Sequence, residues 1–183
     1  LNPTKKAIVI ASDNAKYDLN SSGEYTQGAG SIAMLITANP RVLSFSKEVG
    51  VATEGVFDFF KPRRNFSKEE IFQTENNLEW NGVLENEINI YKEQPVFDGQ
   101  YSNQCYINRI TEAYEHYKEE SHQKGKLYEK WSAILMHLPY CFQGRRTFIE
   151  IFANENPELL ERQIGENNKE KLKALAKSPE YLD

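Results

Sequence analysis

Cysteine and long apolar runs are both scarce in this chain. Its only two cysteines, Cys105 and Cys141, do not form a CxxC pair, which excludes a disulfide framework and a cysteine-based zinc site. No apolar run reaches the roughly 18 residues of a membrane span, and the first residues lack the apolar region of a signal peptide. The sequence therefore predicts a cytoplasmic protein that has no membrane partner and holds no metal.

An excess of positive charge is also missing. Twenty-two Lys and Arg residues stand against 27 Asp and Glu residues, which gives a net charge of -5. General nucleic-acid binding needs an extended basic surface, so we expect no nucleic-acid partner. An anionic ligand would require a local basic cluster. The two candidates are residues 61–64, Lys-Pro-Arg-Arg, and the pair Arg145 and Arg146.

The chain does contain enough apolar residues for one sizeable core. It has 183 residues, of which 39% are hydrophobic and 27% charged, as in a globular protein. Short apolar runs at residues 5–11 and 28–36 predict strands buried on both faces, and residues 41–46 predict a third strand. The first run ends in Ser12, Asp13 and Asn14, at the carboxyl end of a strand, where open α/β sheets usually bind ligands.

Helical periodicity dominates the second half of the chain. Apolar residues recur every three or four positions over residues 103–119, which predicts an amphipathic helix. Residues 145–152, 157–164 and 169–177 predict three further helices, whereas residues 50–95 predict mostly loop with short elements. Buried strands mixed with amphipathic helices indicate an α/β fold.

His137 stands out because it follows an apolar run. Residues 131–136 predict a buried strand, and Pro139 ends the run two residues after the histidine. A neutral imidazole can donate or accept a hydrogen bond near pH 7, which suits acid/base chemistry or carbonyl binding. A histidine beside apolar residues can equally be a hydrogen-bonded core residue. Both interpretations stay open at this point.

Four ordered segments together resemble the hydroxymethylglutaryl-CoA synthase family of the thiolase superfamily. They are residues 11–17 (ASDNAKY), 26–35 (TQGAGSIAML), 57–62 (FDFFKP) and 98–106 (DGQYSNQCY), with His137-Leu138-Pro139-Tyr140-Cys141 following. The resemblance implies part of a thiolase-like layered α/β fold, comprising the end of its first βαβ half and much of its second. Residues 1–46 would end the N-terminal half, and residues 47–183 would belong to the C-terminal half.

The resemblance also implies an acyltransferase activity. Family members condense acetyl-CoA with acetoacetyl-CoA and water through an acyl-enzyme, giving hydroxymethylglutaryl-CoA and CoA in the mevalonate route to isoprenoids. They are typically dimers. They use CoA thioesters as substrates and need no separate cofactor. By position, His137 is the catalytic residue that holds the acetoacetyl carbonyl. The residues matching the substrate pocket are Asp13, Tyr17, Asp58 and Phe59.

Two departures from the family pattern bear on activity. The family's nucleophilic cysteine and its glutamate precede the Asp13 motif, so they would lie before Leu1, and we expect this chain alone to be incomplete and inactive. Phe142 replaces a lysine that commonly contacts CoA, and Arg145 and Arg146 are expected to supply substrate-binding charge instead. Cys105 and Cys141 match no nucleophile.

Two alternatives therefore remain beside the synthase itself. The first is a β-branching synthase-like enzyme that acts on acyl-carrier-protein substrates, which the loss of a cation at Phe142 would favour. The second is a non-catalytic fragment that depends on a partner, because the end of one half and part of another would leave sheet edges that need cover.

Overall fold

The computed structural model describes residues 3–67, 70, 87–165 and 168–175. The chain forms two compact units. One, which we call the helical unit, comprises Leu1–Val9, Ala33–Val56 and Gly99–Asp183. The other, which we call the hairpin unit, comprises Ile10–Ile32 and Phe57–Asp98. No helix among the described residues is long and apolar enough to cross a membrane.

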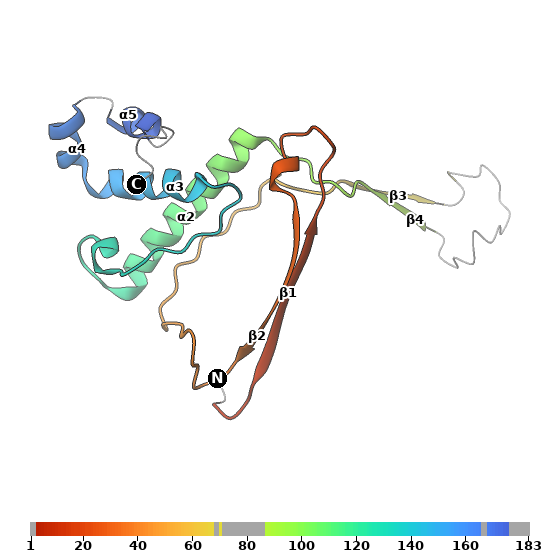
Figure 1. The fold of residues 1–183 in the computed structure, drawn as a ribbon, viewed down its shortest axis with the longest axis horizontal. Coiled ribbons are helices and arrows are strands. Elements are labelled where there is room, and N and C mark those ends of the chain that lie inside the picture. The colour runs from red at the N-terminus through yellow and green to blue at the C-terminus, as the bar shows by residue number, and fades with distance from the viewer. Residues whose placement is uncertain (1–2, 68–69, 71–86, 166–167, 176–183) are drawn as a thin grey trace. The chain divides into compact units, whose positions relative to one another are not determined.

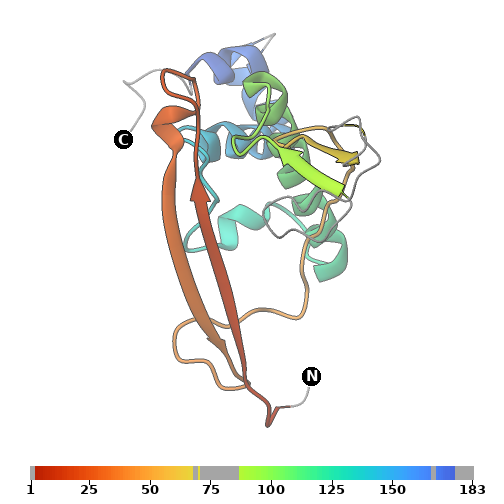
Figure 2. The same cartoon turned by 90° about the vertical axis from the view of Figure 1, so that its right-hand side faces the viewer.

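Strands β1 (Ala7–Ala15) and β2 (Gly28–Ile36) pair with each other in a two-stranded sheet, and their arrows run in opposite directions (Figures 1 and 2). A loop with the short 3-10 helix η1 (Glu24–Thr26) joins them. In this loop, a side chain at Gly23 would overlap the ring of Tyr17, so the close approach requires glycine.

The sequence located both strands correctly but not their burial or the end of the first. Every residue of β2 and eight of the nine in β1 are exposed, and among the described residues these two strands pair only with each other. Strand β1 also continues to Ala15, so Asp13 lies inside the strand rather than beyond its end. The polar residues 12–14 still have free backbone groups for pairing, and this allows the strand to continue.

The hairpin unit also contains a second, antiparallel pair of strands, β3 (Arg63–Ser67) and β4 (Glu87–Tyr91). Arg63 is opposite Tyr91, and a bridge between Phe60 and Val96 extends the pairing beyond the strands. The described part of residues 50–95 is thus mostly loop with short elements, as the sequence predicts. Most of the polar block at residues 75–87 lies outside the described residues.

The described residues of the helical unit contain four α-helices, at or near the expected positions. They are α2 (Gly99–Ser121), α3 (Gln143–Glu155), α4 (Pro157–Ile164) and α5 (Asn168–Leu175), and the short 3-10 helix η2 (Leu127–Lys130) follows α2. Helix α3 contacts all three of the others. Pro157 begins α4, where its missing N–H costs no helical hydrogen bond. Residues 176–177 of the last expected helix lie outside the described residues.

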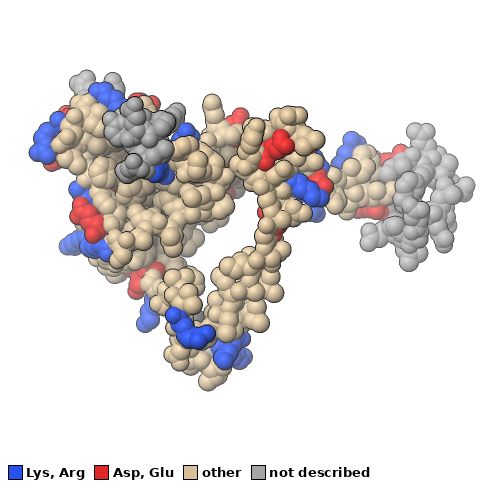
Figure 3. Space-filling model, viewed as in Figure 1, with Lys and Arg blue, Asp and Glu red and all other residues tan. Residues whose placement is uncertain are grey.

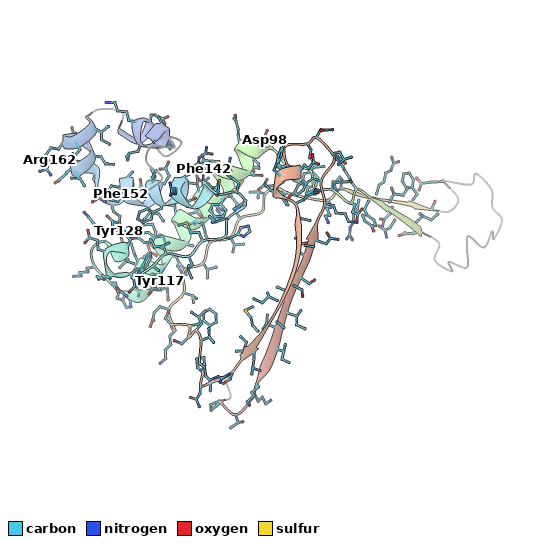
Figure 4. The ribbon with its side chains drawn as sticks, in the orientation of Figure 1. Asp98, Tyr117, Tyr128, Phe142, Phe152 and Arg162 are labelled. Carbon is cyan, nitrogen blue, oxygen red and sulfur yellow. The ribbon has the colours of Figure 1, made fainter. Side chains whose placement is uncertain are left out.

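The core of the helical unit lies between α2 and α3. Tyr114, Leu127 and Ile151 form its buried centre. Tyr128 packs on Phe152 of α3, with ring centroids 5.9 Å apart (Figure 4), and the edge of Tyr114 meets Trp131 at 5.9 Å. Aromatic packing therefore fixes the start of the segment that leads to His137.

Two expected strands of this unit are absent from the described residues. Residues 41–46 and 131–136 both have irregular backbone. A strand needs a neighbour to satisfy its backbone donors and acceptors, and neither segment has one among the described residues. The apolar side chains of residues 131–136 instead lie over α2 and α3, and Trp131, Ile134 and Met136 line a groove there.

Candidate functional site

His137 lies in irregular backbone, with its main chain held and its side chain exposed. The hydroxyl of Tyr106, in the second turn of α2, donates a hydrogen bond of 2.6 Å to the backbone oxygen of His137. The two rings lie 6.4 Å apart, inclined by 36°. Burial raises the pKa of Tyr106, which keeps its hydroxyl a donor. His137 is therefore not the buried core residue that the sequence left open.

An open groove of about 520 Å³ in the helical unit runs along α2 to His137. Its walls are mostly apolar and come from α2, residues 131–136 and α3. Tyr106, Ile110 and Ile134 lie along it, with His137 among the few polar residues at its border. Ligand sites commonly combine an apolar wall with a small number of polar groups.

Helix α3 begins six residues after His137. A Cβ at Gly144 would lie 3.0 Å from Cδ2 of Leu138 and 3.1 Å from Sδ of Met136, so the helix start packs closely against the histidine segment and a larger residue would require these side chains to shift. Phe142, labelled in Figure 4, is the N-cap residue of α3. Its side chain makes no capping hydrogen bond. Phe142 occupies the position at which members of the resembled family commonly have a lysine.

The two expected basic residues lie in the first turn of α3 but differ in their surroundings. Arg146 donates a hydrogen bond to the hydroxyl of Tyr140, and its guanidinium carbon lies 5.3 Å from the centre of that ring. Arg145 is exposed. The start of a helix attracts anions through its free N–H groups and dipole, so this turn combines three sources of positive potential.

Four predicted site residues belong to the hairpin unit, and the structure brings two of them into contact. The edge of Tyr17 faces Phe59 with ring centroids 6.2 Å apart, and Phe97, which the sequence analysis missed, lies 6.1 Å from Tyr17 and 5.1 Å from Phe59. Asp58 is half-buried, whereas Asp13 is exposed and accepts a bond from the N–H of Asn14 at 2.9 Å.

Phe59 adopts a left-handed backbone conformation, with φ of 53°. Such a conformation costs of the order of 1 kcal/mol for a side chain of this size, and it persists only where the surroundings hold it. The contacts with Tyr17 and Phe97 hold it here.

Two ion pairs involve the residues on either side of Tyr17 in the sequence. Nζ of Lys16 lies 2.6 Å from Glu93, and Nζ of Lys92 lies 3.4 Å from Asp18. The hydrogen bond with Lys16 lowers the pKa of Glu93, and the same bond raises the pKa of Lys16. These pairs are exposed and contribute little to stability, but they connect the loop after β1 to the residues after β4.

The remaining candidates are the basic cluster at residues 61–64 and the two cysteines. In the basic cluster at residues 61–64, the guanidinium carbon of Arg64 lies 4.3 Å from the ring centre of Phe66. Cys105 is half-buried and Cys141 exposed, and both are free thiols. The described residues contain no group of three His, Cys, Asp or Glu side chains that could hold a metal ion.

The chain is similar to proteins of one known family. A family model described as hydroxymethylglutaryl-coenzyme A synthase C terminal matches residues 87–181. A hydroxymethylglutaryl-CoA synthase of Enterococcus faecalis is 28% identical over 165 residues, which cover 90% of this chain and 35% of that protein. One of Haloferax volcanii is 29% identical over 175 residues, which cover 92% of this chain and 32% of that protein.

Solved structures give the same match. A structure titled "MvaS in complex with 3-hydroxy-3-methylglutaryl coenzyme A" is 25% identical with a TM-score of 0.64, and the match covers 96% of this chain and 37% of that chain. A second structure, of a synthase complexed with CoA, has a TM-score of 0.55 at 25% identity, over 95% of this chain and 35% of that one. These neighbours, with the mixed strands and helices, confirm the expected thiolase-like α/β class.

The chain thus spans about a third of the length of the relatives it matches. Its N-terminal residues lie outside the family model, but the relatives and solved structures match nearly the whole chain. Since the family model alone matches more than half of the residues, this chain belongs to the hydroxymethylglutaryl-CoA synthase family.

Proposed function

We propose that this chain forms the carbonyl-binding part of a hydroxymethylglutaryl-CoA synthase, an acyltransferase that condenses acetyl-CoA with acetoacetyl-CoA. The main support is the geometry at His137, a fixed main chain with an exposed imidazole beside an apolar groove, in a chain of this family. Claisen-type condensation develops negative charge on a carbonyl oxygen, and a donor that is already in position stabilises that charge without reorganising.

The CoA part of the substrate would bind at the first turn of α3. Arg145 and Arg146 provide the cations that Phe142 does not, and the helix start adds N–H donors. The two solved relatives are complexes with 3-hydroxy-3-methylglutaryl coenzyme A and with CoA. We therefore prefer CoA thioesters to acyl-carrier-protein substrates.

The hairpin unit would contribute substrate-binding residues of its own. The ring of Tyr17 meets that of Phe59, and we expect Asp13 and Asp58 to supply polar groups. The nucleophilic cysteine and the glutamate would come from polypeptide that is not among these 183 residues, so that the chain by itself has no synthase activity. We further propose a cytoplasmic homodimer that serves the mevalonate route and needs no other cofactor.

The decisive experiment replaces His137 in the natural protein that contains these residues. In His137→Ala the apparent Kd for acetoacetyl-CoA should rise about tenfold, because one hydrogen bond to the substrate carbonyl oxygen is lost. Labelling of the cysteine by radioactive acetyl-CoA should persist. The matched control is His122→Ala, an exposed histidine at the end of α2, which should leave both measurements unchanged.

The proposal fails if His137→Ala abolishes acetylation while acetoacetyl-CoA still binds. It also fails if the His122→Ala control weakens acetoacetyl-CoA binding as much as His137→Ala does.

A further inference from the structure

Helix α2 carries a histidine whose side chain holds a segment that is remote in the sequence. The backbone N–H of Val51 donates a hydrogen bond of 2.9 Å to Nδ1 of His116, which lies 65 residues later. A backbone N–H can only donate, so Nδ1 is the acceptor and carries no proton. The bond therefore exists only while the imidazole is neutral.

The other nitrogen of the same ring faces a carboxylate. Nε2 of His116 lies 3.9 Å from Oε1 of Glu120, one turn further along α2, and this contact becomes an ion pair only when the ring is protonated. The two ring nitrogens thus favour opposite states, since Val51 stabilises the neutral imidazole and Glu120 stabilises the imidazolium. The side chain of His116 is 40% exposed, so protons from solvent reach it.

The other charged groups of α2 and of this segment are paired elsewhere or exposed. Arg109 lies 2.6 Å from Glu54 of the segment and 2.5 Å from Glu112. Lys118 pairs with Glu155 of α3. The exposed charged residues nearby are Lys47, Glu48, Glu115 and Glu119, and acidic and basic side chains are interspersed over the helices in Figure 3. Between pH 5 and pH 8 protonation acts here mainly through the imidazole, because carboxyl, amine and guanidinium groups ordinarily titrate outside this range.

The segment that His116 holds contributes to the groove that leads to His137. Gly50, directly before Val51, and Ser46 are among the residues that line this groove. Residues 46–51 have irregular backbone, so they lack the regular hydrogen bonds that fix a helix or a strand. The bond to His116 therefore helps to set where this side of the groove lies.

We propose that His116 is a pH-sensitive positioning residue, which holds the segment of Val51 on α2 when neutral and releases it when protonated. Protonation places a hydrogen on Nδ1, so two N–H groups face each other and the bond to Val51 is lost. The new charge is stabilised by Glu120. The inference goes beyond the proposed function, because the bond to Val51 exists whether or not His137 binds a carbonyl.

The test measures hydrogen exchange at Val51 in the natural protein that contains these residues. The protection factor is the exchange rate of an unstructured amide divided by the observed rate, both at the same pH. At Val51 it should fall about fivefold or more between pH 8 and pH 5, the equivalent of one hydrogen bond. The amides of Ile110 and Ala113 in α2 should keep their protection, which shows that the helix stays folded.

Three variants separate protonation of His116 from a merely structural role. An asparagine offers an amide oxygen near the place of Nδ1 but does not titrate, so His116→Asn should make the protection of Val51 independent of pH. Glu120→Gln removes the charge that favours the imidazolium, and the fall should then occur at lower pH. His122→Ala, at an exposed histidine just after α2, is the control and should leave the fall unchanged.

Three results would overturn the proposal. The first is equal protection of Val51 at pH 8 and pH 5 in the unaltered protein. The second is a fall that persists in His116→Asn, and the third is a fall whose midpoint Glu120→Gln does not move.

Discussion

The contact between Tyr106 and His137 joins a hydroxyl to a main-chain oxygen. The donor lies in α2 and the acceptor 31 residues later, so a single hydrogen bond of 2.6 Å fixes the height of the histidine segment on the helix. The side chain of His137 takes no part in this bond. Holding and chemistry are therefore divided between different atoms of the same residue.

Removing this hydroxyl should loosen the histidine. We expect Tyr106→Phe to lower the free energy of unfolding of the chain by about 1 kcal/mol, the usual contribution of one hydrogen bond. The imidazole resonances of His137 should broaden or shift in NMR spectra. Tyr25→Phe, at a tyrosine that is 96% exposed, is the control and should change neither quantity. An unshifted His137 spectrum in Tyr106→Phe would contradict the anchoring role.

A buried carboxylate makes Lys118 important beyond an ordinary surface lysine. Its Nζ lies 2.6 Å from Oε1 of Glu155, whose side chain is only 6% exposed, so this pair joins α2 to the end of α3. Lys118→Met should cost about 2 kcal/mol of unfolding free energy, since the carboxylate would lose its charged partner inside the protein. Lys124→Met, at an exposed lysine, should cost much less in the same urea titration.

The same pair gives stability a direction with pH. The hydrogen bond to Glu155 is the main reason that the pKa of Lys118 is raised. A raised lysine pKa means that the contribution is complete below the unfolded value of about 10.4, and that it is lost as pH rises through the higher folded value. The difference in stability between wild type and Lys118→Met should therefore shrink above about pH 10.4; a constant difference up to pH 12 would rule out this linkage.

At the scale of elements, helix α2 holds residues 50–54, an irregular segment of the helical unit. The N–H of Val51 donates to Nδ1 of His116 at 2.9 Å, and Arg109 pairs with Glu54 at 2.6 Å. Directly before Val51, a Cβ at Gly50 would overlap the backbone oxygen of Ala113. Glycine thus lets an irregular segment lie directly on a helix.

This close approach predicts a sharp difference between two glycines. Gly50→Ala should destabilise the helical unit by about 1–3 kcal/mol, the usual cost of overpacking, because the obstructing atom belongs to the backbone of α2 and cannot rotate away. Gly55→Ala, where a Cβ would meet nothing within 4 Å, should change the melting temperature little. Equal melting temperatures for the two variants would show that the segment does not pack on α2 in solution.

For the whole molecule, local pattern and long-range pairing differ in how well the sequence foretells them. The helical periodicity at residues 103–119 and Pro157 predicts α2 and α4, because helices satisfy their hydrogen bonds within one segment. Residues 131–136 are as apolar as a buried strand, but an apolar run alone does not say whether a partner strand is present. The strand at residues 131–136 and the burial of β1 and β2 failed for this reason.

The candidate site divides in the same way. The ordered motifs identified the family, and the structure adds the contact of Tyr17 with Phe59. The roles of His137, Asp13, Asp58 and the two arginines stay predictions, as does the boundary between the two halves at residue 46. Phe97 and Tyr106 could not be singled out, because their contacts are distant in the sequence. Phe97 meets Phe59, 38 positions before it, and Tyr106 bonds to His137, 31 positions after it.

The bond from Tyr106 to a main-chain oxygen also has an evolutionary consequence. Any amino acid at position 137 offers the same carbonyl oxygen, so the imidazole can be exchanged by mutation without loss of the anchor. In this chain the polar group that borders the groove can therefore change by a single substitution while the bond from helix α2 still holds the segment.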